Sequence, residues 1–133
     1  MKLLLDTCSL LWALQAPERL STTAEAALED ANNLIYVSTL SFWEISLKAS
    51  IGKLIIENAI PEDFPEFVKA EGWDILPLSA ESAASYGNLP RVSGHKDPFD
   101  RMLAHIAISD NYHLVSSDGP LAQYKTLGLK ICW

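Results

Sequence analysis

Residues 97–118 read DPFDRMLAHIAISDNYHLVSSD and contain one complete helix-to-strand unit. Asp97 stands at the N-cap position ahead of a proline at the first helical position, which predicts a helix up to residue 111. The YHLVS that follows predicts a strand, and Asp118 comes just after it. We therefore expect the helix to run back along a sheet, with an acidic residue at the carboxyl end of the next strand.

The same alternation of strands and helices runs along the rest of the chain. Strands are expected at 2–6, 34–38, 74–78, 112–116 and 129–133, and helices at 10–14, 21–31, 40–50, 61–70, 79–86, 97–111 and 120–126. Capping-box spacing opens two of these helices, Thr22 with Glu25 and Ser41 with Glu44. Pro77 places its strand at an end or an edge. The pattern predicts an α/β fold of three layers, with a mostly parallel sheet of about four or five strands.

Composition limits the class of protein. The chain has 133 residues, 49% of them hydrophobic and 20% charged, so it can bury a core and is expected to form one domain over residues 1–133. The net charge of −7 argues against a nucleic-acid binder with a basic stripe, and fits an acidic partner surface, an effect on solubility, or carboxylates gathered around a metal. Cys8 and Cys132 lack metal-site spacing and are expected to be buried thiols. No apolar run reaches the roughly 18 residues of a membrane span, so the expected location is the cytoplasm.

Several carboxylates are expected at one edge of the sheet. Asp6 ends the strand KLLLD, Asp118 follows a later strand, Asp97 and Asp100 open a helix, and Glu44 lies in the first turn of another. A local role explains most of them separately, as a capping residue, a helix-dipole partner or a turn residue. Asp6 has no such role in the predicted elements. Chemistry in open α/β sheets lies at the carboxyl ends of the strands, which favours a shared site.

Carboxylates that converge need a cation. Without one, their mutual repulsion would raise their pKa values. The three histidines, His95, His105 and His113, are dispersed and form no H-x-x-x-H pair, so hard oxygen ligands point to Mg²⁺ or Mn²⁺. Hydroxyl groups nearby, from Thr7, Ser9, Ser116 and Ser117, suit a metal-dependent phosphodiesterase.

Four segments resemble the PIN domain, and more narrowly the VapC-type toxins of bacterial toxin–antitoxin pairs: LLLDTCSLLWAL, LIYVSTLSFWEISLKASIGKL, HKDPFDRMLAHIAI and LVSSDGPLAQY. The resemblance covers residues 2–133. It implies an endoribonuclease that cuts RNA with Mg²⁺ or Mn²⁺. The residues that match the family's four catalytic acids are Asp6, Glu44, Asp100 and Asp118, and all four are expected to bind one or two divalent ions directly or through waters. Asp97 matches an accessory acid, and Thr7 and Ser116 match hydroxyls that would hold carboxylates or waters. Cys8 departs from the histidine that similar members often carry.

The resemblance also implies partners. RNA phosphates are expected to contact some of the basic residues in or beside the loop before the catalytic helix, namely Arg91, His95, Lys96 and Arg101; the alternative is a plain solvated surface. Asp97 would orient Arg101 or hold a metal-bound water. A neutralising antitoxin and a homodimer are implied. A transfer RNA, a ribosomal loop and a messenger RNA all stay open as the target.

Two other classes of protein fit less well. The intact acids argue against a catalytically silent PIN-fold binding module. A phosphoacceptor receiver would need an aspartate at the end of a central strand and a lysine at the end of a late one, a pattern that this chain lacks. Two divalent cations would bring the formal charge of −7 to −3, so the acidity does not exclude RNA.

Overall fold

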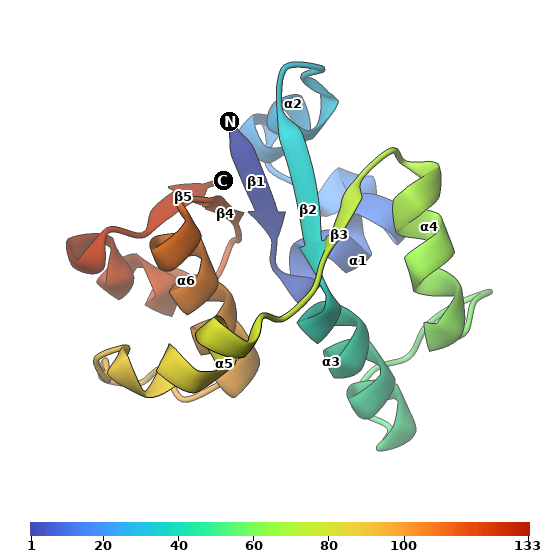
Figure 1. Cartoon of the computed structure of the whole chain (residues 1–133). Helices are drawn as coiled ribbons and strands as arrows, with labels where there is room; N and C mark the ends of the chain where they lie inside the picture. The colour runs from blue at the N-terminus through green and yellow to red at the C-terminus, as the bar shows by residue number, and fades with distance from the viewer.

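The computed structural model describes residues 1–133 as one parallel sheet surrounded by helices (Figure 1). The strands are β1 Lys2–Leu5, β2 Leu34–Ser38, β3 Asp74–Leu76, β4 His113–Val115 and β5 Lys130–Cys132. The α-helices are α1 Thr7–Gln15, α2 Thr22–Glu29, α3 Thr39–Ser50, α4 Phe64–Ala70, α5 Ala80–Ser85 and α6 Pro98–Asp110, and short 3₁₀ helices lie at Pro17–Arg19, Pro61–Asp63, Tyr86–Asn88 and Gly119–Leu127. All four strand pairings are parallel, in the order β3-β2-β1-β4-β5. The predicted α/β class is confirmed.

The central strand divides the core into two layers. Leu4 packs on one face with Leu103 of α6, whereas Leu3 and Leu5 pack on the other with Leu10 of α1 and with α4. Successive side chains of a strand point to opposite faces, so a strand covered on both sides is apolar throughout. All three leucines of β1 are fully buried. Figure 1 shows α6 on one side of the sheet and α1 and α4 on the other, which confirms the three-layer arrangement.

The order of the strands brings two distant parts of the chain together. From β1 the chain moves outward through β2 to β3, and then returns to the other side of β1 to form β4 and β5. The switch point therefore lies between β1 and β4, and ligands of open α/β sheets bind beyond the carboxyl ends of the strands at such a point. The Asp6 amide donates to the Val115 carbonyl at 3.1 Å. The residues after β1 and after β4 are thus neighbours.

Two helices begin earlier than the sequence predicted. Helix α1 follows β1 with no loop, and Asp6 is its N-cap, accepting from the Ser9 amide at 2.7 Å. The expectation that Asp6 has no capping role is therefore wrong. Helix α3 is capped by Ser38, so Ser41 and Glu44 lie inside the helix and form no capping box. In both cases the chain turns directly from strand to helix, which leaves the first turn at the edge of the sheet.

Other local predictions have mixed outcomes. Ser21, not Thr22, caps α2, because its hydroxyl accepts from the Ala24 amide. Pro77 follows the edge strand β3, as predicted. Cys8 is exposed on the first turn of α1, and only Cys132 is buried, so the expectation of two buried thiols is wrong. None of the helices has both the length and the apolar character needed to cross a bilayer.

Candidate metal centre

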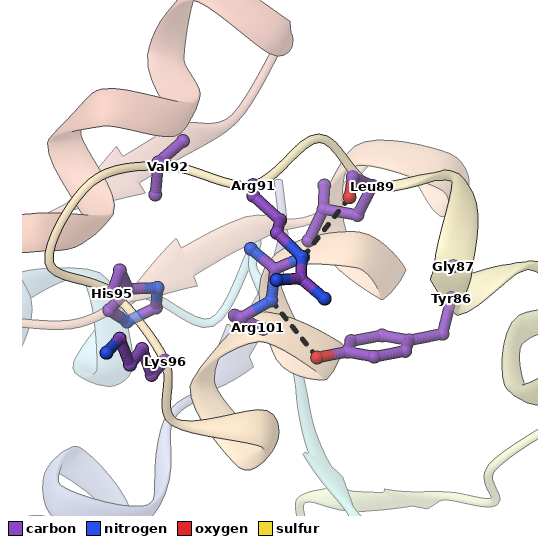
Figure 2. A pocket seen from close by; sticks show the side chains of 8 residues that line it. All are labelled: Tyr86, Gly87, Leu89, Arg91, Val92, His95, Lys96 and Arg101. Carbon is purple, nitrogen blue, oxygen red and sulfur yellow. Dashed lines mark hydrogen bonds between the residues drawn. The ribbon is translucent and has the colours of Figure 1, made fainter.

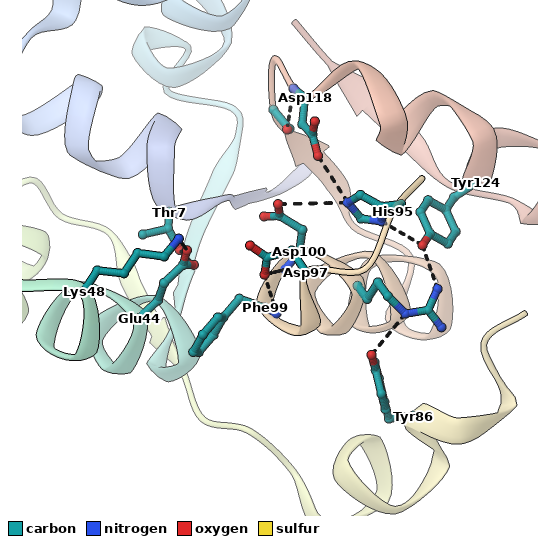
Figure 3. A network of polar contacts seen from close by, with 12 residues as sticks. Thr7, Glu44, Lys48, Tyr86, His95, Asp97, Phe99, Asp100, Asp118 and Tyr124 are labelled. Atoms are coloured by element: carbon teal, nitrogen blue, oxygen red, sulfur yellow. Dashed lines mark hydrogen bonds and ion pairs between the residues drawn. The ribbon is translucent and has the colours of Figure 1, made fainter. Parts of the chain in front are cut away.

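Acidic side chains from three parts of the chain meet beyond the carboxyl edge of the sheet. Asp6 caps α1 directly after β1, Asp100 lies in the first turn of α6, and Asp118 lies just after β4. Asp6 is only 4% exposed, whereas Asp100 and Asp118 are partly open to solvent. Figure 3 shows Asp100 and Asp118 pointing toward one another across the site. Their charges act on one another, since Asp118 contributes to the raised pKa of both Asp6 and Asp100.

His95 lies between two of these carboxylates. Its Nε2 atom is 3.2 Å from Oδ2 of Asp118 and 4.0 Å from Oδ2 of Asp100. One potential ligand atom from each of the three residues lies within 4.8 Å of the others. His95 is 6% exposed, and its buried Nε2 makes no hydrogen bond. The sequence predicts His95 to be an RNA contact and not a ligand, because it forms no H-x-x-x-H pair and lies in a loop outside the predicted helix and strand ends.

The electrostatics of this cluster are unfavourable for ionised carboxylates. The pKa of Asp100 is raised to about 7, first by burial and then by the nearby charges of Asp97, Asp6, Glu44 and Asp118, in that order. Burial also raises the pKa of Asp6, and hydrogen bonds with Ser116 and Ser9 partly offset this. A cation among these oxygens would favour their charged forms. The donor set therefore fits a divalent metal ion.

Glu44 approaches the site from α3 but is held by other side chains. Its Oε1 atom accepts from the Thr7 hydroxyl at 2.6 Å, and Oε2 forms an ion pair with Lys48 one turn later in α3 (Figure 3). The Ser41 hydroxyl lies 3.1 Å from the Thr7 hydroxyl, which can accept its proton. The structure brings neither Glu44 nor Asp6 within the close group of His95, Asp100 and Asp118, although the charges of both act on Asp100. Sequence reasoning missed Lys48, whose i,i+4 spacing from Glu44 was the available signal.

The predicted accessory residues have clear structural roles. Asp97 caps α6 as predicted, with its Oδ1 accepting from the amides of Phe99 at 2.8 Å and Asp100 at 3.3 Å. The hydroxyl of Ser116 accepts from the Asp118 amide at 3.1 Å. These contacts fix the backbone on which Asp100 and Asp118 stand.

Arg101 is an internal anchor rather than a surface cation. It is 7% exposed, and its guanidinium donates to the hydroxyls of Tyr86 at 3.0 Å and Tyr124 at 2.8 Å. It also donates to the carbonyls of Leu89 at 3.1 Å and Pro90 at 3.3 Å. The expectation that the Asp97 side chain orients Arg101 is wrong, and the predicted RNA contact would have to compete with these hydrogen bonds. Arg101 instead ties the loop before α6 to the body of the fold.

A cavity of about 430 Å³ opens beside the carboxylates. Figure 2 shows Arg91, Lys96 and Arg101 among the residues that line it. His95 lines it too and contacts the carboxylates of Asp100 and Asp118. Arg91 and Lys96 are exposed, and no hydrogen bond engages their side chains. The cavity thus offers positive charge next to a negative cluster.

The fold and the acidic edge agree with what sequence comparison finds. A family model of the PIN domain matches residues 3–127, so the chain belongs to the PIN-domain family. Ribonuclease VapC22 from Mycobacterium tuberculosis is 32% identical over 127 residues, which cover 92% of this chain and 91% of that protein. The resemblance to the VapC-like ribonuclease toxins is therefore confirmed at the level of the family.

Solved structures share the same fold at low identity. DNA-bound VapBC from Salmonella typhimurium matches with a TM-score of 0.67 and 17% identity, covering 98% of this chain and 96% of that one. VapBC2 from Rickettsia felis, bound to a DNA fragment from its promoter, matches with a TM-score of 0.58 and 19% identity over the same shares of the two chains.

Proposed function

We propose that this protein is an endoribonuclease that depends on Mg²⁺ or Mn²⁺ and acts as the toxin of a toxin–antitoxin pair. The observation that carries the proposal is the convergence of Asp6, Asp100 and Asp118 at the switch point of the sheet, with Asp100 held at a pKa of about 7. Family membership supports the same activity.

The acids would hold the metal and position its surroundings. Asp6, Asp100 and Asp118 are the proposed ligands, and a bound divalent ion would supply charge neutralisation and an activated water. Glu44 pairs with Lys48 and accepts a hydrogen bond from Thr7, so it would place a hydrogen-bond acceptor beside the ligands. Asp97 and Ser116 act by fixing the backbone under Asp100 and Asp118.

The reaction consumes only water. Water adds to phosphorus in line with the leaving group, one P–O ester bond breaks, and the leaving oxygen takes up a proton. The products are one phosphate monoester and one free hydroxyl group. Arg91 and Lys96 would hold neighbouring RNA phosphates in the cavity beside the acids, and Arg101 would keep that cavity in shape.

The test is RNA cleavage by the purified full chain. Total transfer RNA and a fluorophore–quencher RNA oligonucleotide serve as substrates, with Mn²⁺, with Mg²⁺ and with excess EDTA. We expect cleavage only with metal, and loss of cleavage in Asp6→Asn and Asp118→Asn. Asp74→Asn, an exposed carboxylate on β3, is the matched control and keeps activity. Cutting in EDTA, or full activity in both site variants, would contradict the mechanism. Metal binding without cleavage would favour a silent PIN-fold module.

The proposed partners follow from the family. We propose one PIN unit over residues 1–133, a homodimer, a cytoplasmic location and a protein antitoxin. Light scattering of the purified chain tests the dimer. Co-purification with the product of the neighbouring gene tests the antitoxin, and a stable, non-toxic, solitary protein would count against it.

A further inference from the structure

We propose that His95 binds the divalent ion directly through Nε2, together with Asp100 and Asp118, and that this nitrogen favours Mn²⁺ over Mg²⁺. The inference deepens the proposed function and rests on its metal dependence. It concerns a residue that the acid pattern of the sequence leaves out.

The placement of Nε2 is the first argument. A buried ring nitrogen without a hydrogen bond is unusual, because buried polar atoms normally have a partner. This atom faces the Oδ2 atoms of Asp118 and Asp100 at 3.2 and 4.0 Å (Figure 3). Octahedral ligands at metal distances of about 2.1 Å lie about 3.0 Å apart when adjacent and about 4.2 Å apart when opposite. The two distances from Nε2 thus match the spacing of ligands of one ion, and the ligand atoms of all three residues lie within 4.8 Å of one another.

The support behind the ring is the second argument. Nδ1 of His95 lies 2.8 Å from the hydroxyl of Tyr124, which in turn accepts from Arg101 at 2.8 Å. A phenol oxygen has two lone pairs, so it can accept from both Arg101 and Nδ1. With the proton on Nδ1, Nε2 presents its lone pair to the carboxylates. Metal-bound histidines typically use their other ring nitrogen in such a hydrogen bond, which fixes both the tautomer and the ring orientation.

Arg101 also holds the loop that carries His95. Arg101 bonds the carbonyls of Leu89 and Pro90, and Tyr124 is fully buried in the core. The ring therefore stands on a rigid support rather than on a free loop. A ligand held in place in this way loses little entropy when the ion binds.

The chemistry of the nitrogen sets the metal preference. Mg²⁺ prefers oxygen ligands and retains its waters, whereas imidazole binds transition metals more readily. A site that adds one imidazole to carboxylate ligands should therefore bind Mn²⁺ more tightly than Mg²⁺. Loss of the imidazole should weaken Mn²⁺ binding by on the order of tenfold or more and change Mg²⁺ binding far less.

The experiment is pulsed EPR of Mn²⁺ bound to the full-length chain. Electron spin echo modulation from ¹⁴N is expected in the wild type, and it should change to the ¹⁵N pattern when the protein is made with ¹⁵N-labelled histidine. The coupling should vanish in His95→Gln and persist in His105→Gln, which is matched because His105 is also buried but bonds Ser85 instead. Calorimetry of Mn²⁺ and Mg²⁺ binding to the same proteins gives the affinities.

The outcomes separate the two proposals. Mn²⁺ binding without nitrogen coupling in the wild type would overturn the ligation by His95, whose ring would then only pair with the carboxylates. The proposed metal-dependent nuclease activity would not be contradicted by that result. Coupling retained in a folded His95→Gln protein would also overturn it. Absence of any Mn²⁺ binding would overturn both proposals. The labelling experiment needs no substitution, so it decides the question even where His95→Gln fails to fold.

Discussion

Replacing Asp100 with asparagine should stabilise the metal-free protein at neutral pH. Burial and the surrounding acids raise the pKa of this carboxyl from 3.8 to about 7. Between these two values the folded protein keeps the proton and the unfolded chain has lost it. The free energy of unfolding of the wild type therefore falls by about 1.4 kcal/mol for each pH unit. The stability lost by pH 7 is on the order of 4 kcal/mol, and asparagine avoids this loss because it carries no charge.

The measurement is urea unfolding followed by tryptophan fluorescence in EDTA. We expect Asp100→Asn to match the wild type near pH 4 and to exceed it by an amount that grows to a plateau above about pH 7. Asp74→Asn controls for the change of side chain on an exposed surface and should differ from the wild type by less than about 0.5 kcal/mol. Saturating Mn²⁺ should stabilise the wild type much more than Asp100→Asn. The reasoning is refuted if Asp100→Asn gains no stability at about pH 8, or if its gain does not depend on pH.

Three further predictions follow from other contacts of the site. Although the residue is exposed, partial burial of the Cys8 thiol and the nearby carboxylates raise its pKa to about 11. Iodoacetamide at about pH 8 should therefore alkylate it on the order of 100-fold more slowly than an ordinary cysteine, and Mn²⁺ should speed the reaction. A rate that Mn²⁺ leaves unchanged in a mass-spectrometric time course would count against a cation beside this thiol. Arg101→Lys should lower the free energy of unfolding in urea by about 2 kcal/mol or more, since an ammonium cannot reach all four partners. Substitution of the exposed Arg91 in Arg91→Ala should change it by less than about 0.5 kcal/mol, and equal effects would show that Arg101 is no anchor. Asp97→Ala should be about 1 kcal/mol less stable than Asp97→Asn, because both variants remove the charge and only asparagine keeps the helix cap. Equal unfolding midpoints of the two variants would contradict the capping role.

Local patterns predicted some features well and others poorly. The N-cap of α6 was predictable because Asp97 and the proline after it act within one turn of helix. The starts of α1 and α3 were not, because each helix follows its strand without a loop, and an apolar run looks alike in both elements. The same error hid the capping role of Asp6.

In the candidate site, too, some features could be predicted from the sequence and others could not. Asp6 and Asp118 could be placed together from the sequence, since strands alternating with helices pair in parallel and bring their carboxyl ends to one edge. The hydrogen bond from Thr7 to Glu44 depends on how α3 packs against α1, which no local pattern reports, whereas the ion pair with Lys48 lies within α3. The accessible face of Cys8 likewise depends on what covers α1.

The sequence by itself determined the class of fold, the acids at the strand ends and the family, because hydrophobic period, caps and motifs act over a few residues. Only the tertiary structure decided that Arg101 turns inward, and that Tyr124 holds His95 between Asp100 and Asp118. These residues come from a loop, a helix and a 3₁₀ helix between residues 95 and 124. Their meeting depends on side-chain packing around buried polar groups, which takes its form only when the layers close together.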